Sequence, residues 1–132
     1  MALDEFVQKL ITGSKSFASV ATLMPDGSPH VSVMWVDSDG ENIILNSAEG
    51  RVKTNNLRND NRVAIAITDS ENPYRQAMIR GKVVEVTHDG AMEHTDVLAK
   101  KYLGLDKYPY HQPGDVRVIF KVKPESVYKI DL

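Results

Sequence analysis

The sequence predicts a small, mainly β protein, an antiparallel β-barrel with peripheral helices. Three observations support this fold class. Segments rich in Val and Ile, several with alternating apolar and polar residues, recur along most of the chain and are separated by turn signals. Helical periodicity is confined to a few short segments. The chain has 132 residues, which fits a single domain over residues 1–132. Antiparallel strands in such numbers commonly close into a barrel, because closure removes unpaired edges.

The N-terminal part predicts a helix followed by three strands. Residues 3–11, LDEFVQKLI, place apolar side chains on one helical face, and Gly13 is a natural stop. Tight turns are predicted where PDG and DSDG interrupt the strand pattern. We therefore expect an antiparallel meander with its strands at 16–23, 30–37 and 42–47.

The remaining segments predict two more helices and several strands. Residues 52–60 favour a short connecting helix, and residues 91–104 an amphipathic helix that offers Met92, Val97, Leu98 and Tyr102 for burial. A glycine inside a strand usually marks a bend or bulge, which we expect at Gly81. Residues 106–115 form a loop rich in Tyr and Pro. The expected strands lie at 62–69, 76–88, 115–124 and 126–130.

Composition excludes several classes of function. The net charge of −2 argues against a general nucleic-acid binder. The chain has no cysteine, which excludes disulfides and thiolate chemistry. No leader pattern or membrane-length apolar run is present, so a cytoplasmic protein is the default expectation. The four histidines have no metal-ligand spacing, and we expect them at the surface or in turns, with no metal site.

A cluster of positive charge is the main clue to function. Arg51, Lys53, Arg58 and Arg62 are accompanied by a single acid, Asp60, in a chain that is acidic overall. The first two belong to the first turn of a predicted helix, where free N–H groups and the helix dipole favour a phosphate. Cations at that end oppose the helix dipole, so they cost stability unless an anion offsets them. The alternative interpretation is an ordinary solvated helix face.

A second clue is a wall suited to a flat ligand. Segments 16–22 and 31–37 carry several small side chains next to Met34 and Trp35. A flat aromatic ligand needs such an apolar wall together with backbone hydrogen bonds. The alternative is plain packing inside a barrel. The small side chains are those of Ala18, Ser19, Ala21 and Ser32.

The order of these motifs resembles the flavin/deazaflavin oxidoreductase superfamily. Its fold is the pyridoxamine phosphate oxidase-like, FMN-binding split barrel. The resemblance rests on T-x-x-x-D-G-x-P at 22–29, then an apolar strand, then R-x-K-x-x-N-L-x-x-D-x-R-V at 51–63, and it extends from about residue 3 to the C-terminus.

The resemblance implies a homodimer with two cofactor sites at the subunit interface. Arg51, Lys53 and Asn56 would hold the cofactor phosphate. The tricyclic ring and its side chain would be lined by other residues, and a third group would reach the site from the partner subunit. The lining would consist of the backbone of Ser19, Val20, Ala21, Met34, Trp35 and Val36, together with Asn46 and Ser47, and the third group would be Tyr74, Arg75 and Gln76.

The resemblance also narrows the cofactor and the reaction. The chain lacks the C-terminal Arg and Trp with which pyridoxamine phosphate oxidases bind their substrate, and it looks more like the F420-dependent branch B of the superfamily. The expected function is hydride transfer between coenzyme F420 and an unsaturated organic substrate. Tyr74, Tyr108, His111 or water would supply the proton, and the aromatic loop either covers the substrate or packs on the barrel.

Three alternatives remain open at this stage. The first is an FMN-dependent oxidoreductase of the same fold, which would react with oxygen. The second is a non-catalytic flavin- or haem-binding protein, which would bind its ligand without turnover. The third is a structural barrel whose cationic helix binds nothing.

Overall fold

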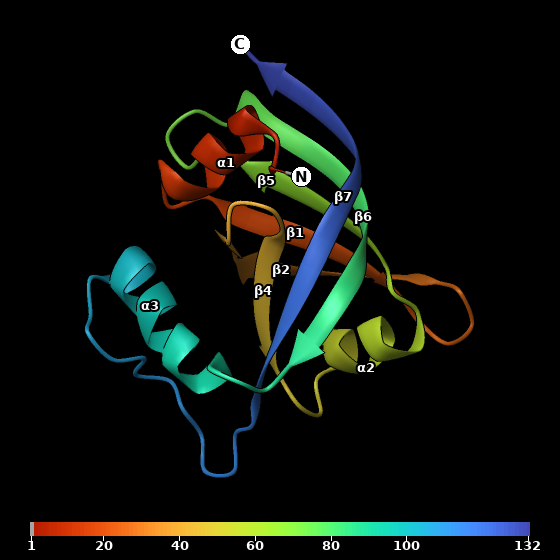
Figure 1. Cartoon of the computed structure of the whole chain (residues 1–132), viewed down its shortest axis with the longest axis vertical. Helices are drawn as coiled ribbons and strands as arrows, with labels where there is room; N and C mark the ends of the chain where they lie inside the picture. The colour runs from red at the N-terminus through yellow and green to blue at the C-terminus, as the bar shows by residue number, and fades with distance from the viewer. Residues whose placement is uncertain (1) are drawn as a thin grey trace.

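The computed structural model describes residues 2–132 and contains three helices and seven strands in that range. The strands form one antiparallel sheet that curls around an apolar core, with α1 near one end and α2 and α3 nearer the other (Figure 1). The elements follow the chain in the order α1 (Glu5–Thr12), β1 (Phe17–Leu23), β2 (Pro29–Trp35), β3 (Asp37–Ser38), β4 (Ile43–Ala48), α2 (Val52–Asn59), β5 (Arg62–Thr68), β6 (Arg75–Thr87), α3 (Ala91–Leu103) and β7 (Arg117–Asp131).

The strand order β2-β1-β5-β6-β7-β4-β3 confirms the mainly β fold class and corrects the predicted meander. β1 and β2 form the expected hairpin, closed by a turn in which Gly27 has a φ of 86°. β4, however, pairs with β7 rather than with β2. The reason is that the chain leaves β2 at Trp35 and crosses to the other end of the sheet through the two-residue strand β3. Among the described residues β2 and β3 are the unpaired edges, so the barrel is split.

The longest strand pair of the sheet is β6 with β7. Residues 115–124 and 126–130, predicted as two strands, belong to one continuous strand, β7, because β6 pairs with both parts across two register shifts. One shift lies at Gly81, as its position predicted. A Cβ at Gly81 would collide with the backbone oxygen of Lys123, so the close approach of the two strands requires glycine there.

The core lies between α1 and the concave face of the sheet. The carboxylate of Asp4 caps α1 by accepting a hydrogen bond from the N–H of Val7 at 3.1 Å, and the helix ends at Gly13 as predicted. Val7, Leu10 and Ile11 are buried among apolar residues of β1, β4, β5, β6 and β7. Burial of this apolar face, as the periodicity of residues 3–11 predicts, holds α1 in place.

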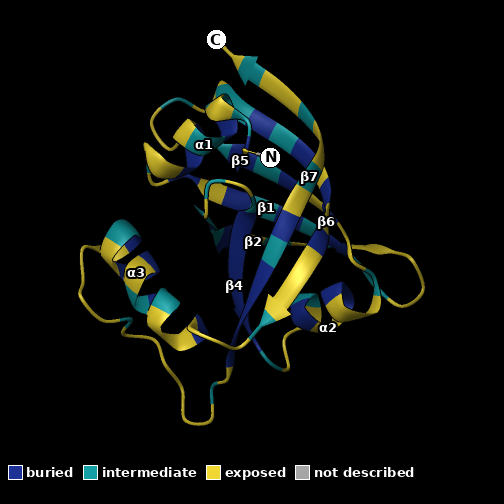
Figure 2. Ribbon diagram, in the orientation of Figure 1, coloured by how far each residue is buried: buried dark blue, intermediate teal, exposed yellow. Residues whose placement is uncertain are grey.

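The helix α3 packs outside the barrel against β4, whose six residues are all buried (Figure 2). Leu98 and Tyr102 are buried, as predicted. Met92 and Val97 are 40% and 58% exposed, which corrects their predicted burial. The small side chain of Ala91 contacts the sheet in their place, in a cluster with Ile44 and Ile119. None of the described helices is long and apolar enough to cross a membrane.

Candidate functional site

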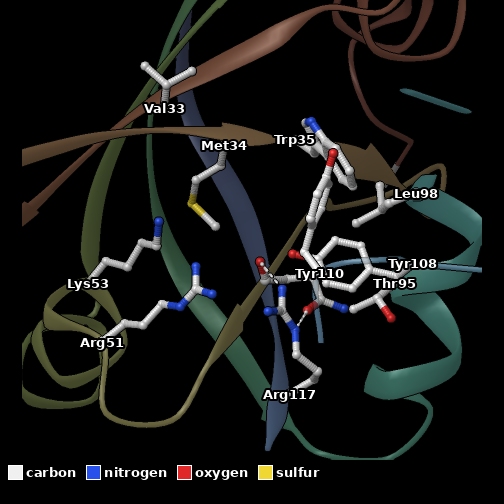
Figure 3. Close-up of a pocket in the computed structure, with 11 residues that line it drawn as sticks. Val33, Met34, Trp35, Arg51, Lys53, Thr95, Leu98, Tyr108, Tyr110 and Arg117 are labelled. Carbon is white, nitrogen blue, oxygen red and sulfur yellow. Dashed lines mark hydrogen bonds between the residues drawn. The ribbon is translucent and has the colours of Figure 1, made fainter. Parts of the chain in front are cut away.

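A cavity of about 210 Å³ opens where β2, β4, α2 and α3 meet the loop that precedes β7 (Figure 3). Cationic side chains occupy one side of this cavity and aromatic side chains the other. No acidic residue is among its lining residues, all of which lie in the described part of the chain. The lining consists of Val33, Met34, Trp35, Asn46, Arg51, Lys53, Thr95, Leu98, Tyr108, Tyr110 and Arg117.

The cationic side is built on the first turn of α2. Arg51 is the N-cap residue of α2, in an extended conformation and without a capping side-chain bond, and no acid lies in that first turn. Lys53 reaches toward β2, with its Nζ donating to Ser32 Oγ at 3.4 Å. Burial, followed by the charges of Arg51 and Arg117, lowers the pKa of Lys53. An anion in the cavity would offset this repulsion and also complement the helix dipole.

The aromatic side is built from β2 and the loop before β7. Trp35 stacks on Tyr102 with 5.0 Å between ring centroids and an interplanar angle of 4°. Tyr108 meets Trp35 edge to face at 5.9 Å, and Tyr110 meets Tyr108 in the same way at 5.6 Å. The aromatic loop therefore continues the wall begun by Trp35 and closes one side of the cavity. Such a wall suits a flat aromatic ring.

A chain of hydrogen bonds supports the floor of the cavity. Arg117, the first residue of β7, is buried and donates from Nε to Asn46 Oδ1 at 2.9 Å. Asn46 Nδ2 contacts His94 Nδ1 at 3.1 Å, and His94 Nε2 contacts Asp37 Oδ2 at 2.8 Å. His94 is only 14% exposed, which corrects its prediction as a surface residue. Among the described residues no cluster of potential metal ligands is found.

Five of the predicted site residues line this one cavity: Met34, Trp35, Asn46, Arg51 and Lys53. They come from β2, β4 and the start of α2, so the structure brings together the predicted phosphate-binding cations and the predicted wall.

Four other predicted residues have side chains that are committed elsewhere. Asn56 is buried, and its amide donates to Thr22 Oγ1 at 3.0 Å. Ser47 accepts a hydrogen bond from Thr54 at 2.9 Å. Val20 and Val36 are in the apolar core. None of these four side chains lines the cavity of this chain.

The remaining predicted residues lie away from this cavity. Ser19 and Ala21 line a shallow depression on the outer face of the sheet. Tyr74, Arg75 and Gln76 are at the start of β6, which lies at the α1 end of the sheet (Figure 1). Arg75 forms ion pairs with Asp69 and Asp131, both at 3.3 Å. Tyr74, Arg75 and Gln76 do not line the cavity of their own chain, so their predicted contribution to a site would have to come from a second copy.

Sequence reasoning missed Val33, Thr95, Leu98, Tyr110 and Arg117 as lining residues. Arg117 is the most informative of them, because a charged residue directly before the apolar run VIF is unusual for a strand interior. Of the four proton donors considered, Tyr108 lines the cavity, and His111 contacts the ring of Tyr108 at 4.8 Å without lining it. Tyr74 is remote from it.

Comparison with known proteins identifies the family of this chain. The family model described as pyridoxamine 5'-phosphate oxidase matches residues 3–131. A solved structure named F420 reductase is 30% identical, with a TM-score of 0.78, over 91% of this chain and 94% of that one. A search of curated proteins gives no significant match.

Two more distant structures share the fold alone. A conserved hypothetical protein from Mycobacterium tuberculosis is 23% identical with a TM-score of 0.76, covering 99% of this chain and 86% of that one. The haem storage protein HutZ from Vibrio cholerae is 14% identical with a TM-score of 0.67, covering 98% and 96%. Since the family model spans nearly the whole chain, this protein belongs to the pyridoxamine 5'-phosphate oxidase family of split barrels.

Proposed function

We propose that the protein is an oxidoreductase that uses coenzyme F420 to transfer a hydride to or from an unsaturated organic substrate. The observation that carries this proposal is the convergence of Arg51 and Lys53 with the wall of Trp35 and Tyr108 on one cavity. A phosphate attached to a flat tricyclic ring matches both sides. The 30% identity to a structure named F420 reductase supports F420 over FMN.

In this proposal the deazaflavin supplies the hydride chemistry, and the protein binds, orients and shields it. Arg51 and Lys53 bind the phosphate, where a charge-assisted hydrogen bond is strong because Lys53 is half-buried. Trp35 is held by its stack on Tyr102, so it offers the ring a rigid wall. The loop carrying Tyr108 and Tyr110 excludes water from this side of the ring.

The cavity of one chain is smaller than the roughly 300–1,000 Å³ usual for ligand sites, which supports a site completed by a second copy. The outer face of the sheet is suited to that contact. Val31 and Val33 on β2 are 67% and 66% exposed, and Tyr128 on β7 is 59% exposed. Val33 also lines the cavity, so the exposed face and the cavity are continuous. A homodimer across this face would cover apolar surface that a monomer leaves in water.

A binding titration tests the cofactor assignment. The protein is produced in a host that makes FMN but not F420, its visible spectrum is recorded, and it is titrated with F420, FMN and haem. We expect colourless protein that binds F420 at micromolar concentration or tighter. Lys53→Ala weakens binding about 10- to 100-fold through loss of a charge-assisted hydrogen bond. Arg58→Gln is the matched control, because Arg58 lies on the same helix but pairs with Glu49 outside the cavity.

Other outcomes of that titration contradict the proposal in distinct ways. Yellow protein, or a preference for FMN with oxygen consumption, identifies an FMN-dependent enzyme. Tight haem binding without turnover of any acceptor identifies a haem-binding protein. If F420 and FMN both fail to bind, the cofactor assignment of Arg51 and Lys53 is wrong.

The dimer is tested separately by mass in solution. Sedimentation should give twice the chain mass of 14.7 kDa. Val31→Glu should give a folded monomer, because it places charge on the proposed contact face, whereas Val97→Glu on the exposed side of α3 should leave the dimer intact. A wild-type monomer would contradict this part of the proposal.

A further inference from the structure

Arg117 is a buried cation that lines the cavity and has one nitrogen without a hydrogen-bond partner among the described residues. The residue is 7% exposed, and its Nη1 is buried without a hydrogen-bond partner in the described range 2–132. Its other two nitrogens each have one hydrogen bond: Nε donates to Asn46 Oδ1 at 2.9 Å, and Nη2 to the backbone oxygen of Asn46 at 3.5 Å. Figure 3 shows the guanidinium near the cavity floor, below Tyr108 and across from Arg51. A buried guanidinium is normally fully paired, so Nη1 requires an explanation.

The charges around Arg117 make its unpaired nitrogen harder to explain without a ligand. Arg51 and Lys53 line the same cavity, and no Asp or Glu is among the lining residues. Burial, followed by the charge of Arg51, lowers the pKa of Arg117, and Tyr108 and Asp115 oppose that shift only in part. A buried charge that is only partly paired is destabilising. Three cations around one cavity are therefore explained most simply by an anionic ligand that contacts all of them.

The guanidinium is also held in one orientation. Asn46 Nδ2 donates to the backbone oxygen of Ala91 at 2.9 Å and to His94 Nδ1 at 3.1 Å. His94 then carries its proton on Nε2, which donates to Asp37 Oδ2 at 2.8 Å. With its amide nitrogen committed in this way, Asn46 can present only Oδ1 to Arg117. The hydrogen-bond chain Asp37–His94–Asn46 therefore fixes the Arg117 side chain and leaves Nη1 as its unpaired nitrogen.

We propose that Arg117 is a third anion-binding residue of the cavity, and that Asp37, His94 and Asn46 are positioning residues that aim its guanidinium. Nη1 donates to an anionic oxygen of the bound ligand. The preferred ligand therefore carries at least two negative charges, on one phosphate or on a phosphate and a second acidic group. This inference rests on the proposed function, in which the cavity binds a phosphorylated cofactor.

Binding and thermal stability measured together test the role of Arg117. In Arg117→Gln we expect the Kd for F420 to rise about 10- to 100-fold, as for loss of a hydrogen bond to a charged group. The melting temperature of the ligand-free variant should stay the same or rise, because an uncompensated buried charge is removed. Arg62→Gln, an exposed arginine paired with Asp60, is the control for net charge and should change neither value. An unchanged Kd with a lower melting temperature would show that Arg117 is purely structural.

Variants of His94 test the positioning role. His94→Ala should weaken binding several-fold, and His94→Gln, which retains a hydrogen-bonding side chain, should restore part of it. Equal affinities in both His94 variants would contradict the positioning role.

Ligands with and without phosphate show which oxygen of the ligand Arg117 binds. If the loss in Arg117→Gln appears with F420 and not with the same deazaflavin lacking its phosphate, Arg117 binds the phosphate. If it appears equally with both, Arg117 binds an oxygen elsewhere on the ligand. Should wild-type protein bind neither F420 nor FMN, the proposed function fails, and inorganic phosphate becomes the probe. Stabilisation of wild type by phosphate that Arg117→Gln lacks would still support the anion site, and its absence in wild type would overturn it.

Discussion

Two helices of this protein are attached to the same sheet by different forces. α1 buries Val7, Leu10 and Ile11 in the main core, and its position depends on apolar contact. α3 buries Ala91, Leu98 and Ala99 outside the main core, and polar side chains also hold it against the sheet. The hydroxyl of Tyr102 accepts from the N–H of Val36 at 3.0 Å and donates to the backbone oxygen of Ser16.

Lys101 strengthens this polar attachment. Its Nζ donates to the backbone oxygens of Ile11 at 2.6 Å and Val36 at 2.9 Å. The difference between the helices matches their positions, because α1 closes the core and α3 forms a wall of the cavity. The hydrogen bonds of Tyr102 and Lys101 fix α3 beside the cavity, where Tyr102 supports Trp35. Four predictions would test this contrast.

The largest effect is expected from the apolar attachment of α1. Leu10→Ala should lower the free energy of unfolding by about 2–5 kcal/mol, because the side chain is fully buried and leaves a cavity. Chemical denaturation measures the change. Lys9→Ala, on the exposed side of the same helix, should cost less than about 0.5 kcal/mol. A smaller effect for Leu10→Ala than for the α3 variant below would break the comparison.

The polar attachment of α3 should be weaker per side chain but more specific. Tyr102→Phe keeps the ring and the stack on Trp35 yet leaves the N–H of Val36 and the oxygen of Ser16 unpaired. We expect a loss of about 1–3 kcal/mol by denaturation. Tyr110→Phe, whose ring is exposed in the aromatic loop, is the control and should be neutral. A neutral Tyr102→Phe would mean that ring packing alone holds α3.

Alkaline pH should weaken the same attachment. Burial raises the pKa of Tyr102 from 10.0 to about 12. Above pH 10 the unfolded chain releases this proton while the folded chain retains it, so stability is full below pH 10 and is lost as pH rises toward 12. The loss is at most about 2–3 kcal/mol. Melting from pH 9 to 11.5 should show a steeper decline in wild type than in Tyr102→Phe, and parallel curves would contradict the raised pKa.

The smallest effect concerns the ion pairs at the surface. Arg58, and then His88, lower the pKa of Glu49 from 4.5 to about 2. These contacts link α2 to the turn before α3. A lowered pKa in the folded state gives stability that is present above pH 4.5 and lost as pH falls toward 2. Glu49→Gln should therefore flatten the acid limb of the melting curve slightly, and Glu93→Gln on α3 should not.

Local pattern in the sequence was sufficient for the elements themselves. The apolar face of residues 3–11, the turn at Gly27 and the bulge at Gly81 each follow from short-range chemistry, and the structure confirms them. The cationic start of α2 was also visible, because Arg51 and Lys53 are two positions apart in a helix without an acidic first turn. The motif order sufficed for the family.

Only the tertiary structure decided which strands pair and which side chains share the cavity. β4 pairs with β7 across about 70 residues of chain, a choice that no local pattern contains. Met92 and Val97 are exposed because α3 meets the sheet through Ala91 and Tyr102, and hydrophobic periodicity cannot tell which part of an apolar face is covered. From the sequence, Arg117 belongs to the strand predicted at 115–124. Its role in the cavity arises because Asn46, 71 positions earlier in the sequence, contacts it and is itself held by His94, and that arrangement is a property of packing.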